Sequence, residues 1–507
     1  MNVGYLLTNS ANKFPDRLAI ISQEGRVTFK TFNDRTDRLA VAMIKAGLKK
    51  GDRAAILFFN SAYFAETYFA AVKAGLIAMP VNFRLAAPEI LFILNNSQAK
   101  ILFYDPEFET RLTDMQEGLE TVRFFVSPHN GGSKLATAHE AFLSTGDAFR
   151  SDFPHVSEDD PCQLMYTSGT TGRPKGAVLT HRNIIWNLFN TICGREDQPG
   201  EKAMIVGPLF HTAALNNHFT IQVALGGTSI LMRKFDPETL LQTIEKEKAT
   251  LMSGAPALYN MLIQHPDAHK YDVRSITKCT AGADKLPMET KKRIMKFFPN
   301  IEGVYDVYGC TEASPCITIL NARDSLRKDM SVGKALPFLE ARVVDQDDRP
   351  LPPGDVGEIV CRGANIMQGY HQDPEATKEA IRDGWLHTGD LARMDEEGFF
   401  YIVDRKKDMI VSGGENIYPR EIEEILIRHP AIADVAVVGI PDEDWGESVK
   451  AFVVIEENRS IDAQAVIEFC KKFLASYKKP RTVVFVPSIP KNPLGKVLKR
   501  VLREERH

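Results

Sequence analysis

Cysteine is scarce in this chain, with seven residues among 507. The seven are scattered, and no two of them have the C-x-x-C spacing of structural zinc sites and redox pairs. A disulfide scaffold and a structural zinc site are therefore excluded, and a reducing cytoplasm fits best.

Long apolar runs are also missing. The longest one, near residues 68–81, is interrupted by Lys73 and is too short to span a bilayer. The first ten residues lack the basic and apolar regions of a signal peptide. The formal net charge of −4 argues against general binding of nucleic acid. We expect a cytoplasmic protein with no transmembrane segment and no nucleic-acid partner.

The length of 507 residues predicts two or three domains, and 44% hydrophobic residues with 25% charged residues are ordinary for a globular protein. Apolar runs at 53–59, 75–82 and 100–104 are typical of buried strands, and residues 64–73 have helical periodicity. The alternation continues through strand-like runs at 203–207, 228–232, 249–253 and 276–281. It predicts helices packed on largely parallel sheets.

The pattern changes after residue 330. Short strand-like runs at 341–345, 357–362 and 399–403 are joined by turns rich in Pro, Gly and Asp, which predicts an antiparallel sheet or small barrel. A charge cluster at 404–408 precedes a small α/β unit, with helices expected at 420–428 and 463–475 and strands at 435–438 and 450–456. We place a domain boundary at this cluster.

Residues 166–176 carry the strongest chemical signal. Four hydroxyl side chains and two glycines fall within six residues, and Arg173 and Lys175 follow them. Such a loop has little apolar surface to bury, but its backbone N–H groups, hydroxyls and cations suit a polyphosphate. It is not a Walker P-loop, because Gly169 and Gly172 are too close together and Lys175 is followed by Gly176.

Further motifs follow in order along the chain. Taken singly, each also has an ordinary structural interpretation, such as a turn, a core residue or a solvated lysine. They comprise His211 after an apolar segment, residues 281–285, residues 306–312, residues 384–390 with the later Asp404 and Arg405, and Lys496 in a basic tail.

This set of motifs, in this order, resembles the adenylate-forming superfamily of acyl-CoA synthetases, luciferases and peptide-synthetase adenylation domains, and is most similar to bacterial fatty-acyl-CoA ligases. The resemblance covers nearly the whole chain. It implies an α/β fold with a large N-terminal domain, made of α/β subdomains and a β-barrel-like subdomain, and a small mobile C-terminal α+β domain. Residues 1–404 would be the AMP-binding domain, 405–407 the hinge with Lys407 as its pivot, and 408–507 the small domain.

The resemblance also assigns roles. Asp306 stands where the family often has an amide, and as an acceptor it could still meet the adenine amino group. Lys496 would reach the reacting carboxylate and the α-phosphate, Thr311 the α-phosphate, and Glu312 would hold Mg²⁺. His211 counts with these catalytic candidates, since its neighbourhood lines the acyl channel in relatives. The remaining implied contacts are Thr167, Ser168, Gly169, Thr170, Thr171, Gly172 and Lys175 to the β- and γ-phosphates of ATP, Tyr308 and Gly309 to adenine, Gly282 and Ala283 between adenine and the acid, Asp390 and Arg405 to the ribose, and Gly413 and Gly414 to the pantetheine arm of CoA.

The implied reaction joins a small carboxylic acid to coenzyme A through an acyl-adenylate, using ATP and Mg²⁺. Ala213, Ala214 and Leu215 would form an apolar wall of the acid site, which favours a medium- or long-chain fatty acid over an aromatic or alicyclic acid. The alternative of another class is a non-catalytic nucleotide-binding protein. The basic tail, with eleven Lys and Arg against two Glu in 470–507, could meet the phosphates of CoA. A homodimer and peripheral contact with a membrane stay open.

Overall fold

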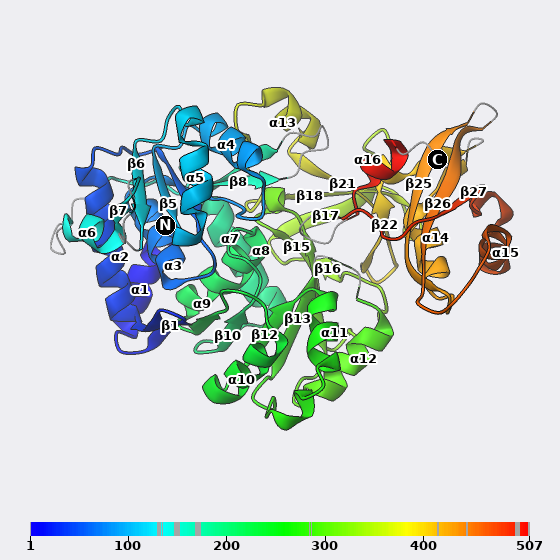
Figure 1. Ribbon diagram of the computed structural model, residues 1–507, viewed down its shortest axis with the longest axis horizontal. Coiled ribbons are helices and arrows are strands. Elements are labelled where there is room, and N and C mark those ends of the chain that lie inside the picture. Colours follow the sequence, from blue (N-terminus) through cyan, green and yellow to red (C-terminus); the bar gives the residue numbers. More distant parts are fainter. Residues whose placement is uncertain are drawn as a thin grey trace. The chain divides into compact units, whose positions relative to one another are not determined.

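The computed structural model describes residues 2–128, 133, 135–146, 153–167, 174–282, 284, 286–412, 415–442, 445–491 and 497–504. Two compact units are distinguished along the chain. Unit 1 comprises residues 1–341 and 361–387, and unit 2 comprises residues 342–360 and 388–507. The ribbon in Figure 1 labels the helices and strands of both units.

Unit 1 contains two large sheets. Among the described residues the first sheet has eight strands, whose inner members β8, β4, β3 and β5 are parallel. Strand β9 joins β8 as an antiparallel hairpin, and β19 pairs with β9. In spatial order the strands are β19 (Gly369–Tyr370), β9 (Lys175–Thr180), β8 (Pro161–Thr167), β4 (Ile77–Pro80), β3 (Arg53–Leu57), β5 (Ile101–Tyr104), β6 (Phe124–Ser127) and β7 (Thr137–Ala138).

The second sheet has nine strands within the described part of the chain, and its centre from β1 to β14 is again parallel. Antiparallel pairs close both edges. In spatial order the strands are β16 (Lys334–Ala335), β15 (Cys316–Leu320), β14 (Val304–Gly309), β13 (Lys278–Gly282), β12 (Leu251–Gly254), β10 (Lys202–Ile205), β11 (Thr228–Leu231), β1 (Leu18–Ser22) and β2 (Gly25–Thr28).

Helices cover both faces of each sheet, which explains why central strands such as β3 and β10 are apolar on both faces. In β3, Ile56 packs into the core between the two sheets, whereas the next residue, Leu57, packs under α4 on the other face. In β10, Ile205 and Met204 divide in the same way between the shared core and the layer of α10, α11 and α12. Strands buried on both faces lose the alternation of polar and apolar residues.

The helices of unit 1 begin at residues suited to capping. The side chains of Thr28, Ser61 and Thr180 accept backbone N–H bonds at the starts of α2, α3 and α7. The helices are α1 (Val3–Lys13), α2 (Phe29–Lys45), α3 (Ala62–Lys73), α4 (Ala87–Asn96), α5 (Glu109–Asp114), α6 (His139–Ser144), α7 (His181–Arg195), α8 (Thr212–Ala214), α9 (Thr220–Leu225), α10 (Pro237–Glu247), α11 (Pro256–Gln264), α12 (Met288–Phe297) and α13 (Pro374–Ala380).

A smaller sheet has the order β17-β18-β21-β20, and β22 pairs with β21. Its strands are β17 (Leu339–Val344), β18 (Gly357–Gly363), β20 (Ile381–Arg382), β21 (Trp385–Met394) and β22 (Phe400–Arg405). Strand β21 runs antiparallel to both β20 and β22. This is the antiparallel sheet that the turn-rich sequence predicts.

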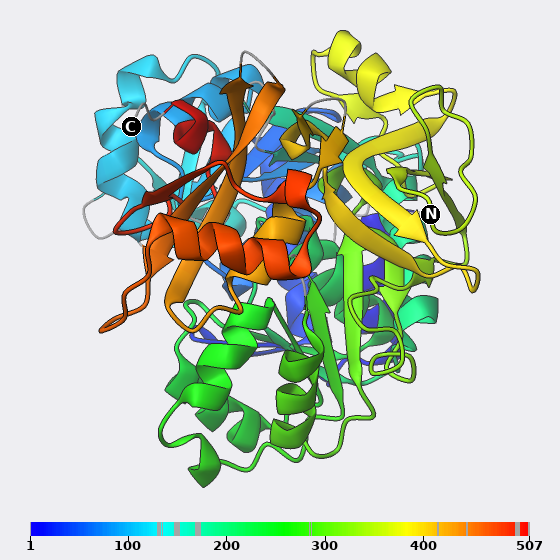
Figure 2. The ribbon, with the colours of Figure 1, turned by 90° about the vertical axis from the view of Figure 1, so that its right-hand side faces the viewer.

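The C-terminal part of unit 2 is built on a sheet of order β24-β23-β26-β25, with β27 on β26. Its elements are β23 (Ile410–Ser412), β24 (Glu415–Ile417), α14 (Pro419–Leu426), β25 (Ile432–Asp442), β26 (Gly446–Ile455), α15 (Ala463–Phe473), β27 (Thr482–Phe485) and α16 (Lys499–Glu504). Helices α14 and α15 pack on one face through Leu426 and Val466, and α16 packs on the other through Leu502. Figure 2 shows α15 lying across this sheet.

The predicted mixed α/β fold, with a large N-terminal domain and a small C-terminal domain, is confirmed. The predicted strand pair at 435–438 and 450–456 is longer than expected, because β25 and β26 pair from Ile432 to Asp442. The hinge at 405–407 stays a prediction. Within the described residues, none of the helices combines the length and the apolar character needed to span a bilayer.

Candidate active site

The predicted phosphate loop joins the two strands of a hairpin. Thr167 at the end of β8 lies opposite Lys175 at the start of β9, and the Thr167 hydroxyl donates to the Lys175 carbonyl at 3.4 Å. The hairpin thus presents the two ends of the loop side by side. Residues 168–173 between them, which include Ser168, Gly169, Thr170, Thr171 and Gly172, lie outside the described residues.

Tyr370 connects this hairpin with the predicted metal ligand. Its strand β19 pairs with β9, and its hydroxyl donates to Glu312 Oε1 at 2.8 Å. Lys175 Nζ lies 5.4 Å from the centre of the Tyr370 ring. Burial and the neighbouring Glu312 carboxylate raise the pKa of Tyr370, so the phenol stays protonated and donates. Sequence reasoning missed Tyr370, and its only signal is an aromatic residue after Gly369.

The adenine motif lies on β14 and in the turn that follows it. Asp306, Tyr308 and Gly309 belong to the strand, and Thr311 and Glu312 begin a 3₁₀ turn, Thr311–Ala313. The Glu312 carbonyl accepts from the Met367 amide at 2.8 Å, which fixes the backbone of the turn.

Two glycines of the predicted site lie where a neighbouring backbone comes close. A Cβ on Gly282, at the end of β13, would lie 2.7 Å from the Val307 carbonyl oxygen of β14. A Cβ on Gly309 would lie 1.8 Å from the Pro315 carbonyl oxygen. Both positions therefore require glycine for reasons of packing alone. Ala283, next to Gly282, lies outside the described residues.

Asp306 is almost completely buried, with 5% of its surface exposed. Burial raises its pKa to about 7, although the ammonium of Lys291 on α12 opposes the shift. Lys291 is wholly buried and donates to the Ser325 carbonyl at 3.1 Å. The carboxyl group at the predicted adenine position thus changes its charge near neutral pH.

Asp306→Asn is expected to change how stability depends on pH. Between about pH 4, where an unfolded Asp loses its proton, and about pH 7, the folded protein holds a proton that the unfolded chain has lost. The free energy of unfolding of the wild type is therefore higher at low pH and falls as the pH rises through this window. The unfolding midpoint of the variant, relative to wild type, should therefore be higher at about pH 8 than at about pH 5. An equal difference in midpoint between the variant and wild type at both pH values would contradict the assignment.

His211 immediately precedes α8 and is half-buried. Its ring packs against that of Phe210, with ring centres 4.4 Å apart. Burial lowers the pKa of His211 to about 4, and Arg84 adds to the shift. The imidazole is therefore neutral at pH 7. Of the three predicted wall residues that follow, Ala213 is exposed, Ala214 is buried and Leu215 is completely buried.

In unit 2, β21 and β22 bring the predicted ribose pair together. Asp390 lies opposite Arg405 in the antiparallel ladder, and Arg405 Nε lies 2.7 Å from Asp390 Oδ1. Asp390 is buried, whereas 44% of the Arg405 side chain is exposed. The carboxylate is thus held in place while the guanidinium faces solvent.

The predicted hinge residue, Lys407, is exposed and lies in a 3₁₀ turn, Lys406–Asp408. On one side, Lys406 Nζ pairs with Glu358 Oε2 at 2.9 Å. On the other, Arg503 of α16 pairs with Asp408 at 3.1 Å and donates to the Lys407 carbonyl at 3.4 Å.

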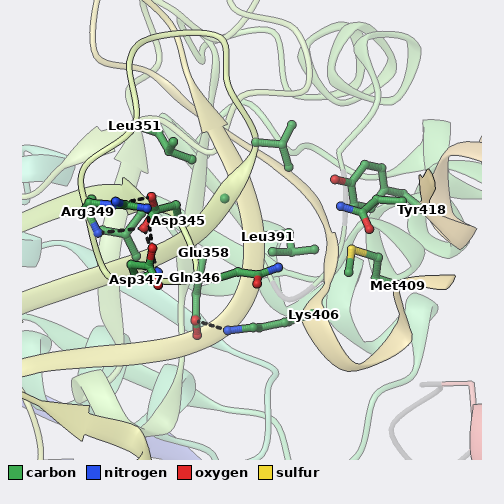
Figure 3. A pocket seen from close by; sticks show the side chains of 14 residues that line it. Asp345, Gln346, Asp347, Arg349, Leu351, Glu358, Leu391, Lys406, Met409 and Tyr418 are labelled. Carbon is green, nitrogen blue, oxygen red and sulfur yellow. Dashed lines mark hydrogen bonds and ion pairs between the residues drawn. The ribbon is translucent and has the colours of Figure 1, made fainter. Parts of the chain in front are cut away.

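A cavity of about 450 Å³ lies beside this turn within unit 2 (Figure 3). Glu358, Lys406, Met409 and Tyr418 are among its lining residues, and the turn at 345–349 forms another wall. Of the predicted site residues that the structure describes, none lines it. It adjoins the ribose pair through Leu391, which follows Asp390 in β21.

The described residues hold no cluster of three or more His, Cys, Asp or Glu that could bind a metal alone. A single carboxylate, the role predicted for Glu312, would be enough for Mg²⁺, because this ion keeps several waters and takes other ligands from substrate phosphates. Lys496, Gly413 and Gly414 lie outside the described residues, so their assignments stay predictions.

Two family models match the chain. The model of the AMP-binding enzyme matches residues 7–371, and that of the AMP-binding enzyme C-terminal domain matches residues 421–496. The chain belongs to the AMP-binding enzyme family. The hairpin of β8 and β9, Glu312 and Tyr370 all lie within the residues that the first model matches.

The similarity to individual relatives covers nearly the whole chain. A feruloyl-CoA synthase of Amycolatopsis sp is 37% identical, with 97% of this chain and 96% of the relative covered. A long-chain-fatty-acid–CoA ligase of Bacillus subtilis (strain 168) is 36% identical, with 99% and 94% covered. The crystal structure of ATP-bound MatB from Rhodopseudomonas palustris has a TM-score of 0.89 at 31% identity, with 99% of each chain covered.

These findings support an AMP-forming acyl-CoA synthetase, an enzyme that ligates an acid to CoA. The predicted resemblance to the adenylate-forming superfamily is confirmed. The alternative of a non-catalytic nucleotide-binding protein is thereby set aside.

Proposed function

We propose that this AMP-binding enzyme activates a medium- or long-chain fatty acid and transfers it to coenzyme A. The observation that carries the ligase chemistry is the contact between Tyr370 and Glu312, because it joins the phosphate hairpin to the predicted metal ligand. The fatty acid is supported by the exposed, apolar Ala213 after His211 and by the similarity to the long-chain-fatty-acid–CoA ligase.

In the first proposed step, a carboxylate oxygen of the acid attacks the α-phosphorus of ATP and pyrophosphate leaves. The reaction brings anions together, so it depends on positive charge that is fixed in advance. Lys175 and Lys496 would supply such charge, and Thr311 would donate to the α-phosphate. Mg²⁺, held by Glu312 and the phosphate oxygens, would supply further positive charge.

His211 contributes differently from these cations. With its pKa lowered to about 4 it carries no charge at pH 7, so it would shape the acid site and offer a hydrogen bond.

In the second step, the thiol of CoA attacks the acyl carbon, loses its proton, and AMP leaves. Gly413 and Gly414 would leave room for the pantetheine arm. All seven cysteines belong to the described part of the chain and none of them forms a disulfide, which supports a reducing compartment such as the cytoplasm.

An aromatic acid is the second candidate, because the feruloyl-CoA synthase is 37% identical over nearly the whole chain. Incubation with ATP, Mg²⁺, CoA and a panel of acids distinguishes the two. The panel runs from acetate to palmitate and includes ferulate, benzoate and phenylacetate. AMP, pyrophosphate and a thioester should appear with the fatty acids. Turnover with ferulate alone would establish the second candidate, and no turnover with any acid would overturn both.

Lys407→Pro is expected to uncouple the two steps, if Lys407 is the pivot about which the small domain turns. Proline restricts φ, and a pivot must change its backbone angles. Thioester formation from supplied acyl-adenylate should fall at least about tenfold while acyl-adenylate formation from ATP continues. Lys407→Ala removes the same side chain but leaves φ free, so it should retain both steps. Normal thioester formation in the proline variant would show that Lys407 is not the hinge.

A further inference from the structure

Two adjacent asparagines are buried beside the candidate acid site. After His211 and α8 the chain forms a π-helical turn, Leu215–Phe219, before α9 begins. Asn216 and Asn217 lie in this turn, with 0% and 2% of their surfaces exposed. Single π turns are uncommon and occur frequently at functional sites. Buried amides need partners: those of Asn216 lie on β8 and beside the turn of Thr311 and Glu312, and those of Asn217 lie on α7.

Asn216 bonds to two segments that carry or adjoin predicted nucleotide contacts. It exchanges two hydrogen bonds with Gln163 of β8: Gln163 Nε2 donates to Asn216 Oδ1 at 2.8 Å, and Asn216 Nδ2 donates to Gln163 Oε1 at 3.1 Å. Asn216 Nδ2 also donates to the Ser314 carbonyl at 3.2 Å. Strand β8 runs into the phosphate loop, and Ser314 follows Glu312 by two residues.

The bond to the Ser314 carbonyl connects Asn216 to the 3₁₀ turn that carries Thr311 and Glu312, because Ser314 ends this turn. Its amide donates to the Thr311 carbonyl at 3.0 Å. Its φ of 73° lies in the left-handed region, which is unfavourable for a residue with a side chain. Surrounding contacts must hold such a conformation, and Asn216 supplies one of them.

Asn217 makes a second, independent link to the same region. Its Oδ1 accepts from Asn187 Nδ2 at 2.9 Å, and Asn187 Oδ1 accepts from the Cys316 amide at 3.0 Å. The backbone carbonyl of Asn217 accepts from the guanidinium of the buried Arg195 at 2.6 Å. The π turn is therefore anchored at two points to the segment directly after the predicted metal ligand.

We propose that Asn216 is a positioning residue that couples the two substrate sites: its amide fixes the acid-side turn against both the phosphate-loop strand and the turn of Thr311 and Glu312. Either substrate, on binding, then orders part of the other's site. The inference rests on the proposed place of the acid beside His211. Allosteric coupling between sites typically amounts to about 5- to 150-fold in affinity.

The test measures how strongly one substrate improves the binding of the other. ATP is replaced by α,β-methylene-ATP, in which a carbon bridge prevents pyrophosphate from leaving, and the acid is dodecanoate or ferulate, whichever the panel shows to be the better substrate. Calorimetric titration gives the nucleotide affinity with and without saturating acid. In wild type we expect the acid to raise nucleotide affinity about tenfold. In Asn216→Leu, which removes all three bonds at similar size, this gain should fall to less than about twofold.

A matched control separates coupling from simple loss of stability. Asn190 of α7 is also completely buried, but its Oδ1 accepts from the Phe338 amide, and among the described residues no recorded hydrogen bond joins it to a predicted catalytic segment. Asn190→Leu should lower the unfolding midpoint and leave the coupling intact. If the leucine variant does not fold, Asn216→Ser replaces it in the same measurement. Serine is smaller than asparagine and cannot bond to Gln163 and Ser314 together.

Each remaining outcome contradicts the inference. If either Asn216 variant kept the wild-type gain in nucleotide affinity, Asn216 would have only a structural role. The same would follow if Asn190→Leu lost as much of the gain as the Asn216 variants. Absence of coupling in a wild-type enzyme that turns over the acid would overturn the inference while the proposed function stands. Failure of the proposed function has a different signature, namely turnover with ferulate alone or with no acid of the panel.

Discussion

Lys496→Ala is expected to slow acyl-adenylate formation by about 10²–10³-fold, the usual loss when a preorganised electrostatic contact to the transition state is removed. In the first step a carboxylate reacts with a triphosphate, and both are negatively charged. A lysine ammonium between them offsets this negative charge, whereas the neutral side chain of alanine does not. The second step has no such requirement, because the thiol attacks an acyl-adenylate that is already activated. Thioester formation from supplied acyl-adenylate should therefore survive.

The two steps are measured separately. Exchange of labelled pyrophosphate into ATP reports the first, and release of AMP from added acyl-adenylate and CoA reports the second. Lys491→Ala is the matched control, because Lys491 lies in the same basic tail but pairs with Asp434 at 2.6 Å. It should retain both rates. Equal loss of both steps in Lys496→Ala would show that the lysine supports the fold or both reactions.

Glu312→Gln is expected to have the next largest effect. The substitution keeps the size of the side chain and its hydrogen bond from Tyr370 but removes the negative charge that would bind Mg²⁺. Pyrophosphate exchange should fall about 10²-fold or more, and the Mg²⁺ concentration for half-maximal rate should rise. A titration of the exchange rate with Mg²⁺ measures both changes.

Two further variants show whether the charge of Glu312 is the cause. Tyr370→Phe removes only the hydroxyl that bonds to Glu312, so its effect should be smaller, and its Mg²⁺ requirement should shift less. Glu375→Gln removes a carboxylate that is 79% exposed and should change nothing. A Glu312→Gln enzyme with a normal Mg²⁺ requirement would show that Glu312 is not the metal ligand.

Much of the fold was predictable, because its signals are local. The apolar runs of β3, β5 and β10 indicate strands buried on two faces, and each was located to within a few residues. The ends of the predicted C-terminal strands were less accurate. Pairing between β25 and β26 carries both strands beyond their apolar centres, and a ladder depends on the partner strand rather than on either sequence alone.

The sequence by itself determined the chemistry of the family, because the phosphate loop and the motif of Tyr308, Thr311 and Glu312 are contiguous strings whose residue types show what they can bind. Tertiary structure alone decided how these strings meet. Tyr370 reaches Glu312 because β19 pairs with β9. Asp306 titrates near pH 7 because burial removes its water. Asn216 reaches both Gln163 and Ser314 because a π turn packs between the two sheets. Each of these properties depends on residues far apart in the chain, and only packing brings such residues into contact.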